Sequence, residues 1–129
     1  MEFSRKMETG FPSPAADHLE NALDLEELIV QRPSATFYVR AEGNAMKSSG
    51  ICDGDILVVD RSVHATNGNI VIAAVDEEPL IRRLAKKGSR FYLLSDDPKF
   101  EPIVIHHEMN WMIWGVVSWV IHRCGGENE

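Results

Sequence analysis

From Ala35 onward the chain is a series of short β-rich runs separated by turn residues, and no segment of about ten residues there has the 3.6-residue period of a helix. Turn formers occupy several of the gaps: Asp53-Gly54-Asp55, Asn67-Gly68 and Asp97-Pro98. We predict strands at residues 36–41, 56–60, 69–75, 80–84, 90–95 and 103–105, followed by 111–122 as one long strand or as two strands broken at Gly115. This pattern predicts a mainly-β fold, either a sandwich or a partly open barrel.

The residues before Ala35 do not have this β-rich pattern. Residues 1–13 have no periodicity and are predicted to form an N-terminal arm. Residues 14–33 are predicted to be a short helical lead-in, with starts at Ser13-Pro14 and at Asp24, where Glu27 is the capping-box partner, and an end at Pro33. Residues 34–129 then form the β-rich body.

The size and charge of the chain limit what it can do. Its 129 residues suffice for one domain with an arm, and thirteen basic against twenty acidic side chains give a net charge of −7. Such a surface repels a phosphate backbone, so direct DNA binding is not expected, although action on DNA through a partner remains open. The polar first ten residues and the short apolar segment 111–121 predict a soluble, cytoplasmic protein without a membrane segment.

Metal and cofactor chemistry is not indicated by the sequence. The histidines have no metal-ligand spacing, and surface positions are expected for His18, His64, His106, His107 and His122. The acidic residues Asp53, Asp55, Asp60 and Asp76 lack the spacing of a calcium loop, so turn carboxylates are the better interpretation. Cys52 and Cys124 belong to no metal motif, and free thiols are expected although one disulfide is conceivable. We predict no metal and no cofactor.

Two further groups are weighed against nucleic-acid binding. The last apolar segment contains Trp111, Trp114 and Trp119, but few basic residues surround them, so core packing or a protein contact is favoured over base stacking. The basic cluster of Arg82, Arg83, Lys86, Lys87 and Arg90 is predicted to be a solvated hairpin face, with docking of an acidic partner as a further possibility.

The segment 43–55 is the most informative loop. A predicted strand runs into Gly43 and a polar turn before the next strand begins at Ile56. Loops at strand ends can hold a nucleophile clear of the core, but a plain connecting loop has the same pattern. Periodicity alone does not separate the two.

A resemblance to a known family adds to this. Its motifs are Gly10-Phe11-Pro12-Ser13-Pro14-Ala15-Ala16-Asp17, Pro33-Ser34-Ala35-Thr36, Gly50-Ile51 with Asp53-Gly54-Asp55, Val58-Val59-Asp60 and Gly68-Asn69-Ile70-Val71-Ile72-Ala73-Ala74-Val75-Asp76. In this order they closely resemble the UmuD/MucA branch of the LexA/UmuD group of self-cleaving serine peptidases. The match is dense over residues 10–84 and looser at Pro102-Ile103 and Gly115-Val116-Val117.

The resemblance implies a homodimeric, β-rich peptidase-like body whose arm carries a cleavage site, here Thr9-Gly10. In the family, a filament of RecA on single-stranded DNA stimulates self-cleavage. The shortened dimer then joins a Y-family polymerase subunit as the accessory part of translesion polymerase V.

The chain departs from this family at both catalytic positions. Family members read Gly-Asp-Ser-Met where this chain reads Gly43-Asn44-Ala45-Met46, so Ala45 occupies the position of the nucleophilic serine. The general-base lysine falls on Arg82. A methyl group cannot attack a carbonyl, and a guanidinium cannot supply the neutral amine that a Ser–Lys dyad requires. Rescue by Ser48, Ser49 or Lys86 is not expected, because four residues along a strand span about 13 Å.

The sequence leaves several interpretations open. Ala45 is either an engineered change that traps an uncleaved form or part of a natural non-cleaving relative, and the same choice applies to Arg82. Alternatives in function are a LexA-like repressor fragment that lacks its DNA-binding domain and a non-enzymatic interaction module. We expect the arm around Thr9-Gly10 to lie near Ala45, in its own subunit or in the partner.

Overall fold

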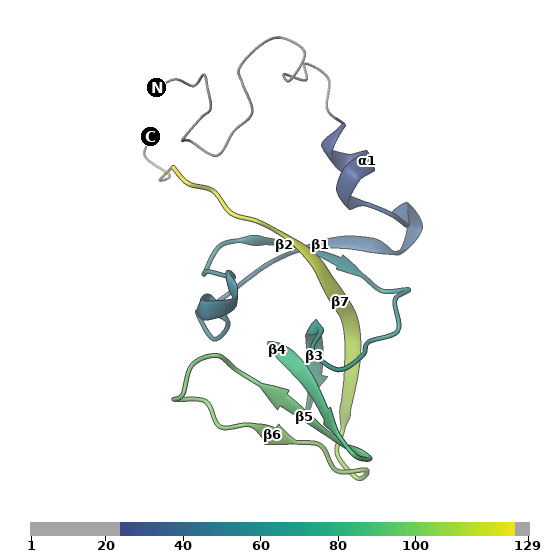
Figure 1. The fold of residues 1–129 in the computed structure, drawn as a ribbon, viewed down its shortest axis with the longest axis vertical. Coiled ribbons are helices and arrows are strands. Elements are labelled where there is room, and N and C mark those ends of the chain that lie inside the picture. Colours follow the sequence, from purple (N-terminus) through teal and green to yellow (C-terminus); the bar gives the residue numbers. More distant parts are fainter. Residues whose placement is uncertain (1–23, 126–129) are drawn as a thin grey trace, which may run out of the picture.

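The computed structural model describes residues 24–125, which form a body built on one antiparallel sheet (Figure 1). Its strands run in the spatial order β1-β2-β7-β3-β4-β5-β6. Their bounds are β1 Thr36–Arg40, β2 Ile56–Asp60, β3 Ile70–Val75, β4 Glu78–Lys87, β5 Arg90–Leu94, β6 Ile103–Val104 and β7 Trp111–Ile121. The predicted mainly-β fold is therefore confirmed.

The last strand, β7, joins the two halves of the sheet. It is one continuous strand that runs along most of the body (Figure 1), pairing with β2 through its second half and with β3 through its first. The register shifts once in each pairing, which leaves Ser118 and Trp114 as extra residues on β7. Bulges of this kind bend a strand and increase its twist, so β7 serves both halves without a break at Gly115.

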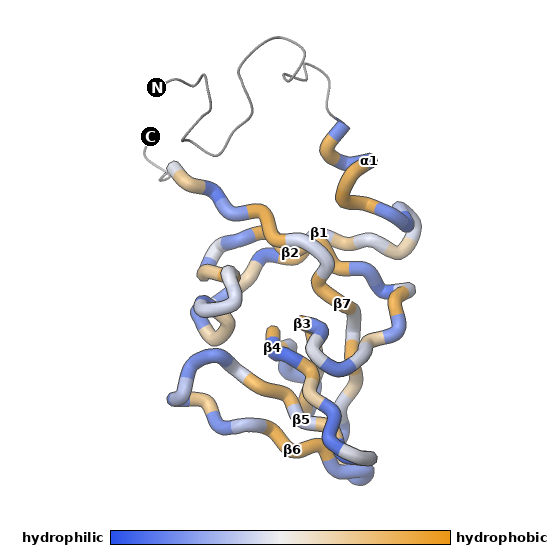
Figure 2. The backbone as a smooth tube through the Cα atoms, viewed as in Figure 1, coloured by the Kyte–Doolittle hydropathy of each residue, from blue (hydrophilic) through white to orange (hydrophobic). Residues whose placement is uncertain are grey.

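Hydrophobic side chains pack on both faces of the central strands. Along β3, Val71 belongs to one buried cluster and Ile72 to another, as expected for successive residues that point to opposite faces. Figure 2 shows hydrophobic residues concentrated on the strands and hydrophilic ones at many of the turns between them. The cluster that contains Ile72 also holds Met46 and Ile51 from the connection between β1 and β2. That connection is thus part of the core.

Helix α1, Leu25–Ile29, begins as predicted at Asp24, whose carboxylate accepts a hydrogen bond from the Glu27 N–H. It ends at Ile29, earlier than the expected end at Pro33, which instead starts a 3₁₀ turn, η2 Pro33–Ala35. The buried Ile29 and Val30 pack with Val58 of β2. The arm, the first predicted helical start and Thr9-Gly10 lie outside the described residues. Among residues 24–125, no helix is long and apolar enough to cross a membrane.

The β3–β4 hairpin differs from the prediction. Strand β4 begins at Glu78, two residues before the expected start, and includes Pro79. The tight turn consists of Asp76 and Glu77, both at positive φ (52° and 70°). This turn geometry usually contains Asn or Gly, so its sequence signal is weak here. The consequence for the site is a longer strand that carries residues 79–82 alongside β3.

Candidate functional site

The connection between β1 and β2 is held at both ends of its polar turn. Met46 and Ile51 are buried in the core cluster on either side of the 3₁₀ turn η3, Lys47–Ser49. The Gly43 N–H donates to the Asp53 carboxylate at 2.6 Å, and the Asp53 N–H donates to the Asn44 side chain at 3.0 Å. This loop is therefore a constrained part of the structure rather than a loose connection.

Ala45 lies in this loop, immediately before the buried Met46, and is itself partly exposed. Its carbonyl oxygen accepts hydrogen bonds from the Asp96 N–H at 2.9 Å and from the Ser95 hydroxyl at 2.7 Å. These bonds tie the loop to the connection between β5 and β6. Ala45, which the resemblance places at the nucleophile position, is therefore held by the core on one side and by these hydrogen bonds on the other.

Strand β4 brings Arg82 to the same place. A pocket of about 270 Å³ is lined by residues of β1, of the loop after it, and of β4, and its lining includes both Ala45 and Arg82. Most of its other walls are apolar, among them Met46, Ile51 and Ile72. Two residues that are far apart in the sequence therefore face one cavity, next to the core cluster.

The Arg82 guanidinium is in an unusual environment for a surface-strand arginine. The residue is only 8% exposed, and its Nη1 donates to the Ile81 carbonyl at 2.9 Å, while its Nε is buried without a hydrogen-bond partner. The guanidinium carbon lies 5.2 Å from the ring centroid of Phe100. Burial lowers the pKa of Arg82, and the nearby Glu78 carboxylate opposes that effect. The pocket therefore contains a buried cation instead of an amine that can become neutral.

The hydroxyl and amine groups nearest in sequence to Ala45 and Arg82 lie outside their pocket. The Ser49 hydroxyl accepts a hydrogen bond from the Arg83 guanidinium at 2.6 Å, and Ser48 lines a different pocket. Lys86 is exposed toward the hairpin end, where its amine lies 5.8 Å from the Phe91 ring centroid. Within residues 24–125, none of these three side chains lines the pocket of Ala45 and Arg82.

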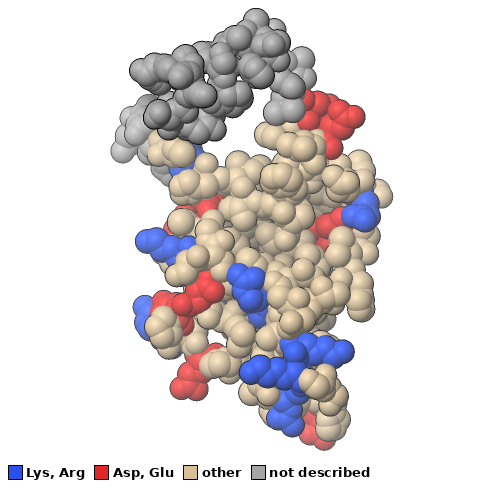
Figure 3. Space-filling model, in the orientation of Figure 1, with Lys and Arg blue, Asp and Glu red and all other residues tan. Residues whose placement is uncertain are grey.

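The basic cluster divides into two parts. The prediction of a solvated hairpin face is wrong for Arg82, because successive residues of a strand point to opposite faces and Arg82 points inward. It holds for Lys86, Lys87 and Arg90, which are exposed. Figure 3 shows Lys and Arg side chains gathered at the end of the molecule that holds the β4–β5 hairpin.

The tryptophans of β7 serve mainly in packing. Trp114 meets Phe37 edge-on, with ring centroids 5.4 Å apart, and packs against the core cluster. Trp111 lies 6.3 Å from the Phe91 ring. Trp119 is exposed on β7, so it remains free for a contact with another protein.

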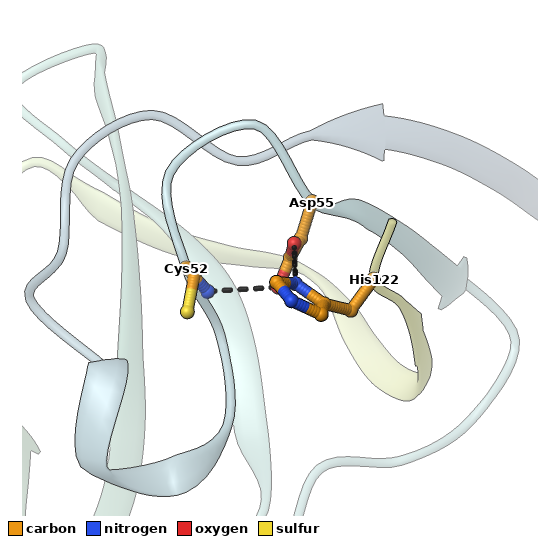
Figure 4. A group of neighbouring side chains, drawn as sticks. All are labelled: Cys52, Asp55 and His122. Atoms are coloured by element: carbon orange, nitrogen blue, oxygen red, sulfur yellow. Dashed lines mark hydrogen bonds and ion pairs between the residues drawn. The ribbon is translucent and has the colours of Figure 1, made fainter. Parts of the chain in front are cut away.

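A second group of polar side chains was missed by the sequence analysis. Cys52 and Asp55 at the end of the β1–β2 connection meet His122, which directly follows β7 (Figure 4). The His122 Nδ1 lies 2.7 Å from one carboxylate oxygen of Asp55, and the Cys52 N–H donates to the other at 2.8 Å. The sequence indicates only a turn carboxylate for Asp55 and only a surface position for His122. No short motif joins them, because the contact depends on how β7 pairs with β2.

The electrostatics of this second group favour an ionised carboxylate. Burial by itself would raise the pKa of Asp55. The Cys52 N–H and the His122 imidazole together outweigh burial, so the pKa of Asp55 lies below its usual range. Both cysteines of the chain are free thiols.

Comparison with known proteins adds to this geometry. The family model described as "Peptidase S24-like" matches residues 2–118. Protein ImpA of Escherichia coli is 42% identical over 122 residues, which cover 94% of this chain and 82% of ImpA. Protein SamA of Salmonella typhimurium strain LT2 is 43% identical over 121 residues (94% and 84%), and Protein MucA of Escherichia coli is 38% identical over 117 residues (90% and 80%).

Proposed function

Because the chain belongs to the peptidase S24-like family and is similar to MucA, SamA and ImpA, we propose that it is a UmuD-like protein of SOS mutagenesis whose self-cleaving site is disabled. The disabled positions are Ala45 and Arg82. In this proposal the chain keeps the fold and the cleft of a self-cleaving peptidase but not its dyad.

The observation that carries the proposal is the shared pocket of Ala45 and Arg82. A serine hydroxyl on the constrained loop and a lysine amine from β4 would enter this one cavity, which is the arrangement that a Ser–Lys dyad needs. Ala45 has no oxygen to attack a carbonyl. Arg82 remains a cation even where burial lowers its pKa, so it cannot remove a proton from a nucleophile.

The remaining features of the cleft suit binding without cleavage. Its walls are largely apolar, and β1, which contributes residues 39 and 40 to them, is an edge strand of the sheet. An edge strand offers unpaired backbone groups to an extended peptide. We infer that the arm around Thr9-Gly10 occupies this cleft as an uncut segment, in its own subunit or in its partner.

Protein partners fit the charge of the chain better than nucleic acid does. A net charge of −7 disfavours direct DNA binding. The proposal therefore includes a cytoplasmic homodimer that interacts with a filament of RecA on single-stranded DNA and with a Y-family polymerase subunit. It assigns the chain to translesion synthesis as an accessory subunit that stays uncleaved.

The proposal is tested by incubating the purified chain with RecA filaments and by co-purifying it with a Y-family polymerase subunit. We expect the chain to stay at full length, to sediment as a dimer at micromolar concentration, and to bind the polymerase subunit. Capture of an operator-binding LexA-like partner would support the repressor-fragment alternative instead. Absence of all of these partners, together with a monomeric state, would leave only an unrelated interaction module and contradict the proposal.

A further inference from the structure

The group formed by Cys52, Asp55 and His122 has no role in the proposed cleft. None of the three residues lines the pocket of Ala45 and Arg82 in the described part of the chain. Cys52 and Asp55 lie just before β2, and His122 is the residue directly after β7. In Figure 4 the His122 ring points back to the loop that carries Cys52 and Asp55.

The spacing of their ligand atoms suits a metal ion. The Cys52 sulfur, one Asp55 oxygen and one His122 ring nitrogen all lie within 4.8 Å of one another. In a tetrahedral zinc site the metal lies about 2.0–2.3 Å from such atoms, so neighbouring ligand atoms are about 3.2–3.6 Å apart. On binding, atoms that lie near the 4.8 Å limit need to approach by about 1 Å, whereas the His122 Nδ1 and the Asp55 oxygen, which are 2.7 Å apart, need to separate by about 0.5 Å. His122 lies outside the hydrogen-bonded ladder of β7, so its backbone is free to make this adjustment.

The carboxylate is already oriented for such a role. Asp55 is only 4% exposed, and one of its oxygens is held by the Cys52 N–H. The other oxygen is directed at His122, on the side where the group meets solvent, because the His122 side chain is 53% exposed. Hydrogen bonds that fix a ligand in this way are typical of metal sites, and the exposed imidazole leaves a path for an ion to enter.

We propose that Cys52, Asp55 and His122 form a binding site for a divalent cation of the zinc class, with its fourth position open to solvent. One thiolate, one imidazole and one carboxylate suit borderline metals such as Zn²⁺ and Co²⁺, whereas Mg²⁺ and Ca²⁺ prefer a shell of oxygen atoms. Binding replaces the contact between His122 and Asp55 by two metal–ligand bonds and releases the thiol proton of Cys52.

A bound ion would join the end of β7 to the loop that carries Ala45. The loop is connected to this site through Asp53, whose carboxylate holds the Gly43 N–H. An ion that binds only the folded chain stabilises it by an amount that grows with the logarithm of the ion concentration once this exceeds the dissociation constant. A bound ion would therefore stabilise the contact between the β1–β2 loop and the end of β7, beside the peptidase-like cleft. This effect does not depend on whether the cleft is active.

Cobalt is the probe that reports the ligands directly. The full-length chain, freed of metal with a chelator, is titrated with Co²⁺ and followed by absorption spectroscopy. We expect the intense visible bands of tetrahedral cobalt together with a thiolate-to-cobalt charge-transfer band, both of which disappear when Zn²⁺ is added. Zn²⁺ should also raise the melting temperature, and Mg²⁺ should not.

Four variants separate this site from adventitious binding. Cys52→Ser should abolish the charge-transfer band, and His122→Gln should weaken Co²⁺ binding by more than about tenfold. Cys124→Ser and His106→Gln are matched controls, since both residues are exposed and outside the group, and both variants should bind cobalt like the unaltered chain. Circular dichroism checks that each variant is folded. A charge-transfer band that survives Cys52→Ser, that is lost with Cys124→Ser, or that never forms in the unaltered chain would overturn the proposal.

Discussion

Replacement of the buried Asp55 by asparagine is the sharpest test of how the β1–β2 loop is held. The carboxylate accepts hydrogen bonds from the Cys52 N–H and faces His122, and it is almost fully buried. Asparagine has nearly the same shape but no charge: its amide oxygen can still accept from the Cys52 N–H, but that bond is then neutral, and its NH₂ group faces His122 in place of a carboxylate oxygen. Asp55→Asn should therefore destabilise the fold without creating a cavity.

The size of the effect follows from the two contacts. A hydrogen bond to a charged group contributes about 1.5–3 kcal/mol, and the neutral amide retains about half of one such bond. The contact with His122 is worth no more than about 1 kcal/mol, because that side chain is half exposed to solvent. We expect a loss of about 1–2.5 kcal/mol in the free energy of unfolding near neutral pH.

The pH dependence has a definite sign. Since the pKa of Asp55 is lowered in the folded protein, the carboxylate stabilises the fold above its unfolded pKa of about 3.9 and loses this effect as the pH falls through the folded value. The stability difference between the unaltered chain and Asp55→Asn should therefore shrink as the pH falls below about pH 4.

Urea unfolding followed by circular dichroism, in the presence of a chelator, measures both quantities. Glu101→Gln is the matched control, because this carboxylate is exposed and its removal should change stability by less than about 0.5 kcal/mol. An Asp55→Asn chain as stable as the control at pH 7 would show that the charge of Asp55 does not stabilise the fold. So would a deficit that stays the same size below about pH 3.

Three further predictions concern the core and the pocket, and each is measured by urea unfolding. Gly115→Ala should cost about 1–3 kcal/mol, because the added methyl carbon would lie 2.5 Å from Val59 Cγ1. Met46→Ala should cost about 2–5 kcal/mol, because it leaves a cavity under the loop. Arg82→Met should be neutral or stabilising by up to about 2 kcal/mol, because it removes a buried charge whose Nε has no partner. A large loss of stability in Arg82→Met would show that the guanidinium supports the fold.

Much of the fold could be predicted because it depends on local signals. Strand β2 has the predicted bounds, and Asp24 caps α1 as expected. The continuous β7 could not be distinguished from two strands, because its bulges form only against β2 and β3. The predicted strands leave residues 76–79 as a connection, but its tight form at Asp76 and Glu77 has no sequence signal because these residues do not usually adopt positive φ.

The candidate site could be identified from the sequence only through a family resemblance. That resemblance is confirmed by the family model and by the identities to MucA, SamA and ImpA. It singled out Ala45 and Arg82, but only the pairing of β4 with β3 shows that both residues face one pocket. Arg82 is buried because successive side chains of β4 point to opposite faces of the sheet. The run of basic residues in the sequence does not show which of them point inward. The catalytic assignment of the two positions stays a prediction, as does Thr9-Gly10.

The pairing of Cys52 and Asp55 with His122 had no usable sequence signal. Seventy or so residues separate the two segments, and their meeting depends on the antiparallel register in which Ile56 lies opposite Ile121. The spacing of residues in a motif does not predict long-range contacts of this kind. Their prediction requires the pairing of the strands.

We propose that Ala45 and Arg82 alone separate this chain from a self-cleaving peptidase. Intact-mass spectrometry of the Ala45→Ser, Arg82→Lys double variant, incubated with filaments of RecA on single-stranded DNA, tests this most directly. We expect a fragment that begins at Gly10 in the double variant, and full-length protein in the unaltered chain and in each single variant. A folded, dimeric double variant that stays uncut, or an unaltered chain that is cut at Thr9-Gly10, would contradict it.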